Sequence, residues 1–186
     1  MKILFMRPPA PNILKHLQIL NSEPLELEYL HTVAQQHGWD DMIYDGFNNK
    51  KNAREIMKTF QPDVVAITGY ITQEKLMLKY AKTAKEINPN IITVIGGVHA
   101  QLNYERLYSP DVDYVFRSED VNAFGNLLDF FAGNSLDLST ISGLCWRENG
   151  SWIRRWLKLD SFISLWDWKP SPTGNLKATI NKYPLM

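Results

Sequence analysis

The stretch PDVVAITGY at residues 62–70 decides the fold class of this chain. Its central run, Val64 to Ile67, is continuously apolar and mostly β-branched, which is typical of a parallel strand covered on both faces. Pro62 ends the helical segment before it, and Gly69 follows it without a side chain. The stretch therefore predicts a buried strand that ends where a ligand can approach the backbone.

Apolar runs of strand length alternate with segments of helical periodicity on both sides of this stretch. Strands are expected at residues 3–6, 42–44, 64–67, 91–95 and 114–116. Repeated strand–helix–strand units with short loops form right-handed crossovers, so the strands should be parallel and helices should cover both faces. We therefore predict an α/β fold, a flavodoxin-like, doubly wound, five-stranded parallel sheet of order 2-1-3-4-5.

Three of the expected helices carry specific predictions. The first begins near Ser22 and is expected to bury an apolar stripe made of Leu25, Tyr29, Leu30, Val33 and Ala34. A shorter helix is expected from Gln101 to Leu107. Ser118 or Asp120 is expected to cap the last helix.

Residues 136–186 differ in character from this alternation. Asn149-Gly150 lies between two strand-like runs and predicts a hairpin, and five of the six tryptophans lie in this last quarter. We expect an α/β domain at 1–135 and, at 136–186, a hairpin and a linker toward a further domain. Whether the tryptophan-rich tail contacts that domain or folds back onto the α/β body stays open.

The composition excludes several classes of function. Twenty basic residues balance 20 acidic ones, and an isoelectric point near 6.9 argues against nucleic-acid partners. No apolar run approaches the roughly 18–20 residues that span a bilayer, and no signal-peptide pattern is present. The single cysteine, Cys145, cannot form an intramolecular disulfide or supply a structural zinc or iron–sulfur site. We expect a cytoplasmic protein in which Cys145 is buried and unreactive.

The loops after the strands are where such sheets bind ligands. RPPAP at residues 7–11 excludes a phosphate-binding loop, because three prolines remove N–H donors and fix φ. Gly69, Gly96 and Gly97 leave the sheet edge open to a broad ligand, although the two adjacent glycines could also form a plain turn. No nucleophilic triad, catalytic carboxylate pair or metal-ligand cluster is recognisable. The residues therefore predict a binding platform without catalytic or metal-binding groups.

Several of these stretches, in this order and spacing, resemble the N-terminal cobalamin (B12)-binding-type domains of class B radical SAM proteins. The matching segments are residues 1–9, 62–73, 89–100, 113–119 and 141–144, so the resemblance covers about residues 1–155. That group includes anaerobic magnesium-protoporphyrin monomethyl ester cyclases and various methyltransferases.

The resemblance implies a corrin over the carboxyl edge of the sheet, contacted together with its nucleotide tail by the loops after the strands. Carried onto this sequence, it implies a cofactor site made of Arg7, Pro8, Gly69, Tyr70, Thr72, Gly96, Gly97, Val98, His99, Arg117, Ser118 and Glu119. In the parent proteins a following domain binds a [4Fe–4S] cluster through Cys-x3-Cys-x2-Cys and cleaves S-adenosylmethionine.

Three features depart from the family pattern. One cysteine is too few for the radical SAM motif, so radical chemistry cannot reside in these 186 residues. The Asp-x-His-x-x-Gly segment that supplies a lower axial imidazole in methionine-synthase-like domains is missing after the first strand. Ser118 and Asp120 replace the glycines of the usual Gly-Glu-Gly-Glu, of which Glu119 is kept.

The resemblance and its departures together imply a non-catalytic domain that positions a corrinoid, without that lower ligand, for a radical SAM domain of the same parent chain. The alternative is a scaffold or interaction domain of the same fold that binds no cobalamin.

Overall fold

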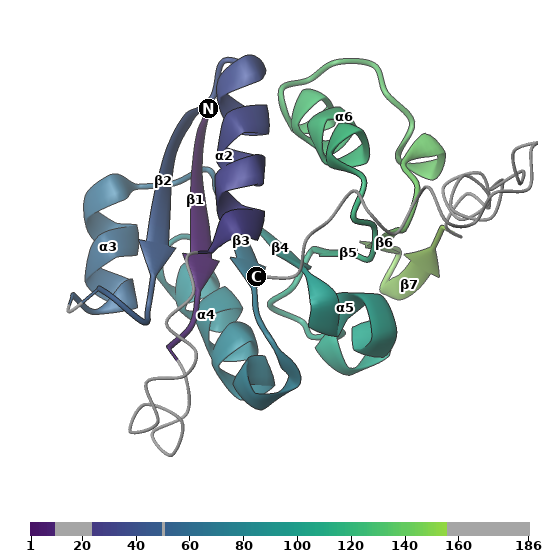
Figure 1. Ribbon diagram of the computed structural model, residues 1–186. Coiled ribbons are helices and arrows are strands. Elements are labelled where there is room, and N and C mark those ends of the chain that lie inside the picture. The colour runs from purple at the N-terminus through teal and green to yellow at the C-terminus, as the bar shows by residue number, and fades with distance from the viewer. Residues whose placement is uncertain (10–23, 50, 156–186) are drawn as a thin grey trace, which may run out of the picture.

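The computed structural model describes residues 1–9, 24–49 and 51–155, which form one seven-stranded sheet with helices on both faces (Figure 1). The strand order is β2-β1-β3-β4-β5-β6-β7, and β1 to β5 are parallel. Their bounds are β1 Lys2–Arg7, β2 Asp40–Asp45, β3 Val64–Thr68, β4 Ile92–Gly96, β5 Tyr114–Phe116, β6 Leu144–Glu148 and β7 Ser151–Arg154. The fold is α/β and Rossmann-like, as expected.

The expectation of a five-stranded, all-parallel sheet is wrong, because the hairpin joins the same sheet. β6 pairs antiparallel with β5, and β7 pairs antiparallel with β6. Asn149 and Gly150 form the tight turn between them, with φ of 49° and 81°, the conformation that Asn-Gly favours. The hairpin hydrogen-bonds the edge of β5, which would otherwise present unpaired backbone groups. The boundary predicted at residue 135 thus falls between two segments that contribute to one sheet.

The helices divide between the two faces of the sheet. Their bounds are α2 Leu25–Gln36, α3 Ala53–Phe60, α4 Glu74–Ile87, α5 Val98–Asn103 and α6 Val121–Phe131, with the 3-10 turns η1 Ile71–Gln73, η2 Tyr104–Leu107 and η3 Leu138–Thr140. One buried cluster joins α2 and α6 to the sheet, and the other joins α3, α4 and α5 to the opposite face. Figure 1 shows α2 and α6 on the same side of the strands.

Burial on both faces explains why the strands are apolar without alternation. In β1, Ile3 and Phe5 pack under α2 and α6, whereas Leu4 and Met6 pack toward α3 and α4, and all four are fully buried. The Phe5 ring lies 6.1 Å from that of Phe124 on α6. Each strand therefore contributes side chains to two separate cores.

The apolar stripe predicted for α2 is partly wrong. Leu25 and Tyr29 are 57% and 67% exposed, whereas Leu27 and Ala34 are buried. Leu27 and Ala34 are seven residues apart, which is two helical turns, and this is the face that packs on the sheet and beside α6. Leu25 and Tyr29 are instead directed away from the core, near the start of the helix.

The loop after β4 is shorter than expected. α5 begins at Val98, directly after Gly97, rather than at Gln101, because a φ of +86° at Gly97 turns the chain from strand to helix at once. Asp120 caps α6 as predicted, with Oδ1 accepting the Asn122 N–H at 2.9 Å.

The predicted cap at Ser22 and the tail beyond Arg155 lie outside the described residues. No helix of the described ranges is long and apolar enough to cross a membrane.

Candidate functional site

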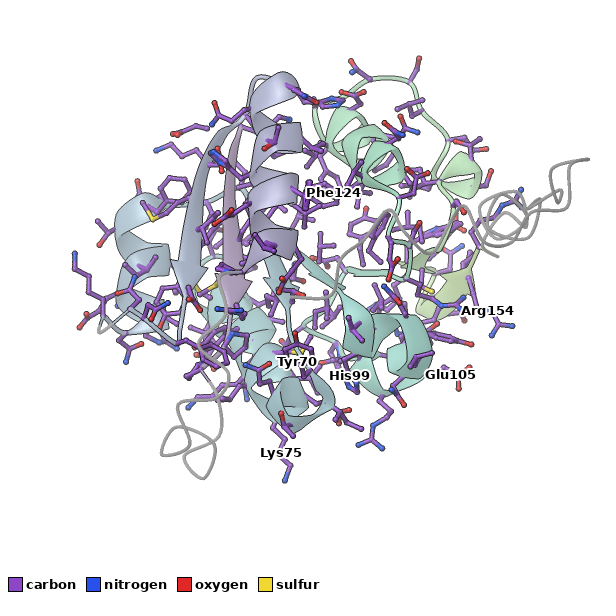
Figure 2. All side chains as sticks on the ribbon, viewed as in Figure 1. Tyr70, Lys75, His99, Glu105, Phe124 and Arg154 are labelled. Carbon is purple, nitrogen blue, oxygen red and sulfur yellow. The ribbon has the colours of Figure 1, made fainter. Side chains whose placement is uncertain are left out.

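A cavity of about 300 Å³ opens at the carboxyl ends of β3, β4 and β5, between α2 and α6. Phe124 of α6 lies at its buried end and is 2% exposed, while Tyr70 lies at the sheet edge and is 50% exposed (Figure 2). Side chains of Leu27 and Leu30 from α2 complete its apolar wall. The cavity is therefore a pocket with an apolar interior whose mouth is at the edge where this fold binds ligands.

Alternate side chains of β3, β4 and β5, which face the same side of the sheet, form the floor of the cavity. Ala66 of β3, Val94 of β4 and Phe116 of β5 all face α2 and α6. Ala66 and Val94 are side by side in the parallel register and are small, which leaves space above them. The Phe116 ring packs edge-on against that of Phe124, with centroids 5.9 Å apart, and closes the side nearest β5.

The adjacent glycines after β4 have different steric roles. A Cβ on Gly97 would lie 2.2 Å from Oγ1 of Thr68, which is closer than any real contact, and its φ of +86° is strained for other residues. A Cβ on Gly96 would meet the carbonyl oxygen of Phe116 at 3.4 Å, an ordinary distance. Of the two, Gly97 is the position that requires glycine, and it does so beside the cavity.

Thr68 places a polar group in this apolar interior. It ends β3, lines the cavity and is only 6% exposed. Within the described part of the chain its hydroxyl makes no hydrogen bond. Its oxygen is not sealed off within the protein, so the hydroxyl is available to a group inside the cavity.

Seven of the twelve residues predicted for the cofactor site line this cavity, namely Gly69, Tyr70, Gly96, Gly97, Val98, Ser118 and Glu119. The other five, Arg7, Pro8, Thr72, His99 and Arg117, do not line it. Thr72 is exposed in η1, outside the cavity. Contact of any of the twelve with a corrinoid stays a prediction.

Arg7 and Pro8 stabilise the loops beside the site. The Arg7 guanidinium is buried and donates from two nitrogens to both oxygens of Asp45, each at 3.0 Å, which joins the carboxyl ends of β1 and β2. Its charged group also lies 4.5 Å from the centre of the Phe47 ring. Gln73, almost fully buried, donates to the Pro8 carbonyl and accepts the Tyr70 N–H at 2.9 Å, which connects the loops after β1 and β3.

His99, which is labelled in Figure 2, belongs to α5 and does not line the cavity. Its side chain is fully buried, and Nε2 lies 2.8 Å from Oε2 of Glu74 at the start of α4. Arg106 donates to both oxygens of the same carboxylate, at 2.7 and 3.0 Å. This arrangement holds α5, and with it Gly97, against α4.

Replacing Glu74 with glutamine should change how stability depends on pH. Hydrogen bonds from Arg106 and His99 lower the pKa of Glu74 below its usual 4.5, despite opposing desolvation. A lowered pKa stabilises the folded state above pH 4.5 and loses that contribution as the pH falls through the folded-state value. We therefore expect the difference in unfolding free energy between wild type and Glu74→Gln to shrink below about pH 4. Urea titrations from pH 3 to 7 measure it, and a difference constant over that range contradicts the assignment.

Arg117 lies on the opposite side of β5 from the cavity. Its guanidinium stacks 3.9 Å from the centre of the Tyr104 ring, and Nε and Nη1 are buried without hydrogen-bond partners in the described structure. Cys145, on β6, is fully buried, and desolvation raises its pKa, as expected for an unreactive thiol. Trp152 of the hairpin stacks on Tyr108 at 4.1 Å, so this face is filled by aromatic rings.

Residues that sequence reasoning missed come mainly from the helices beside the cavity. The missed lining residues include Glu26, Leu27, Tyr29, Leu30, Thr68, Gln101, Phe116, Asp120 and Phe124. Apolar helix positions such as Leu27 and Phe124 have the same sequence pattern whether they pack in the core or line a cavity. Thr68 had a usable signal, because it is a polar residue that ends an otherwise apolar strand.

Comparison with known proteins places this geometry in a family. The model of the B12 binding domain matches residues 20–128, more than half of the chain. This chain belongs to the B12-binding domain family. It is 33% identical over 155 residues to an uncharacterized methyltransferase of Pyrococcus horikoshii, covering 81% of this chain and 33% of that protein. It is 30% identical over 114 residues to the anaerobic magnesium-protoporphyrin IX monomethyl ester cyclase of Rubrivivax gelatinosus, covering 58% of this chain and 20% of that protein.

Solved structures show the same fold. The cobalamin-dependent S-adenosylmethionine radical enzyme OxsB, with aqua-cobalamin bound, superposes with a TM-score of 0.67 at 14% identity, over 84% of this chain and 22% of that one. The resemblance to cobalamin-binding domains of radical SAM proteins is thereby confirmed for this B12-binding domain. It spans a third or less of the length of these curated relatives.

Proposed function

We propose that this B12-binding domain binds a cobalamin-type corrinoid at the carboxyl edge of β3 to β5 and positions it for a neighbouring radical SAM domain. The observation that carries the proposal is the cavity beside Gly97, at the edge where the fold binds ligands. A cavity of about 300 Å³ suits one heterocycle with its sugar, which fits the nucleotide tail, with the macrocycle over the mouth.

The residues present fit such a group. Gly97 allows the chain to turn beside Thr68, where a Cβ would fit only by displacing the threonine side chain, and the apolar wall suits an aromatic base. The Thr68 hydroxyl offers one hydrogen bond inside. Ser118 and Asp120, which replace the glycines of the family pattern, line the cavity without closing it. Bound cobalamin would supply a cobalt that carries a methyl group or accepts electrons, while this domain orients it and limits water access.

Among the described residues that line the cavity there is no histidine, and His99 pairs with Glu74 instead. We therefore propose that a corrinoid bound here takes no imidazole ligand from these lining residues.

The proposed catalytic partner would lie outside this domain. Relatives such as the Pyrococcus horikoshii protein are about three times the length of the matched region. Among the described residues, no group of three or more histidine, cysteine or acidic side chains could hold a metal ion. We propose that the neighbouring domain binds S-adenosylmethionine, which the name of the structurally similar OxsB includes, and a [4Fe–4S] cluster, which is bound in the structurally similar methyltransferase TsrM of Kitasatospora setae.

Reconstitution with hydroxocobalamin tests the proposal. The protein is incubated anaerobically with the corrinoid, desalted, and scanned in the visible range. We expect corrin absorbance to stay with the protein at close to one equivalent, whereas bovine serum albumin treated in parallel should lose it. Complete loss from this domain at micromolar protein would contradict the proposal and favour a scaffold of the same fold.

A further inference from the structure

The mouth of the cavity is acidic on both sides. Glu26 lies at the start of α2, and Glu119 and Asp120 lie between β5 and α6. All three are exposed, and no lysine, arginine or histidine is among the described residues that line the cavity. Carboxylates gathered around a concave site create a negative potential, so each negative charge added to a bound ligand near them weakens binding.

The protein leaves most of the acceptor capacity of these carboxylates unused. Glu119 accepts one hydrogen bond, from Nε2 of Gln101 at 3.0 Å, and Asp120 accepts the Asn122 N–H that it caps. Glu26 makes no hydrogen bond within the described residues. Since a carboxylate offers about four lone-pair sites, this rim (Glu26, Glu119 and Asp120) can accept several N–H groups from a ligand.

The interior below the rim indicates independently that a ligand binds here. The cavity holds about 300 Å³, and Thr68, a residue only 6% exposed, lines it with a hydroxyl that makes no hydrogen bond within the described residues. The ligand must therefore combine an apolar part for the interior with N–H donors at the mouth.

Building on the proposed corrinoid function, we propose that the rim makes this domain selective for corrinoids whose peripheral arms are carboxamides. A carboxamide NH2 donates to a carboxylate and carries no charge. An arm hydrolysed to a carboxylic acid loses both N–H donors of the amide and places a further negative charge close to the carboxylates of the rim. Glu26, Glu119 and Asp120 would thus distinguish fully amidated corrinoids from their acid precursors and hydrolysis products.

Affinities for hydroxocobalamin and for its separated monocarboxylic acids, in which one peripheral propionamide is hydrolysed, test this selectivity. We expect at least one acid isomer to bind about tenfold more weakly than the amide at low salt. The ratio should fall as salt is added, because the rim is exposed. Equilibrium dialysis read by corrin absorbance gives each dissociation constant with the tail and the cobalt unchanged.

Two triple variants test whether the rim causes the selectivity for the amide over its acids. E26Q/E119Q/D120N removes three charges but keeps the side-chain sizes, and asparagine at position 120 can still cap α6. This variant should reduce the ratio of the acid and amide dissociation constants to about twofold or less. D40N/E86Q/E148Q removes three exposed carboxylates at the opposite edge of the sheet and should leave the ratio as in wild type.

The outcomes separate this inference from the function on which it rests. Equal affinity for the amide and every acid isomer overturns the selectivity alone, as does an unchanged ratio in E26Q/E119Q/D120N. Failure of wild type to bind hydroxocobalamin overturns the proposed function, and the selectivity with it.

Discussion

Gly97→Ala is expected to weaken hydroxocobalamin binding by roughly 10- to 100-fold, so that the corrinoid is lost on desalting. The added Cβ would lie 2.2 Å from Oγ1 of Thr68, and both residues line the cavity. Relief of that overlap must move Thr68 or the turn into α5, and either movement changes the shape of the cavity. Dialysis of the variant against hydroxocobalamin, beside wild type, measures the effect.

Gly133→Ala is the matched control for this substitution. Gly133 has a φ of +89°, close to the +86° of Gly97, but a Cβ there meets nothing within 4 Å. Both variants place alanine at a positive φ, and at Gly97, whose ψ is −173°, the backbone strain is about 1–3 kcal/mol. Only the Gly97 variant also displaces a residue that lines the cavity. Circular dichroism melts establish that both fold. If the two variants bind the corrinoid equally well, the cavity beside Gly97 is not the binding site.

Asp45→Ala is expected to lower the free energy of unfolding by about 3–5 kcal/mol. The guanidinium of Arg7, 2% exposed, loses the carboxylate that accepts two hydrogen bonds from it, and a buried charge without that partner is costly. Asp45 also accepts the Phe47 N–H at 3.1 Å, so the loop after β2 should loosen as well. Urea denaturation followed by circular dichroism measures the loss.

Asp40→Ala provides the comparison within the same strand. The Asp40 side chain is 65% exposed and 4.0 Å from the Lys2 ammonium, a pair that solvent screens, so we expect a change of about 0.5 kcal/mol or less. If Asp45→Ala costs no more than Asp40→Ala, the buried pair does not stabilise the fold.

Local patterns were sufficient to predict most elements. The continuous apolar run at 64–67 predicted a strand buried on both faces, and β3 is buried along its whole length. Asn149-Gly150 predicted the hairpin, since few other pairs adopt two successive positive φ values. These signals succeed because strand, turn and cap preferences depend on residues that are close together in the chain.

Assignments that depend on distant partners were less accurate. Arg7 and His99 lie at the carboxyl edge, as their positions predicted, yet each side chain pairs with a carboxylate, Asp45 and Glu74 respectively, outside the cavity. Those partners are 38 and 25 residues away, and neither pairing has a local signature. The buried face of α2 likewise follows from contact with α6, almost a hundred residues later in the chain.

The order of short apolar runs, glycines and turn residues was enough to establish an α/β platform with its open edge after β3, β4 and β5, because backbone conformation follows from neighbouring residues. Which side chains face the cavity was decided only by packing. The twist of the sheet, the rotation of α2 against α6 and the pairing of Arg7 and His99 with distant carboxylates are collective outcomes of contacts between distant segments. One-dimensional periodicity does not encode them.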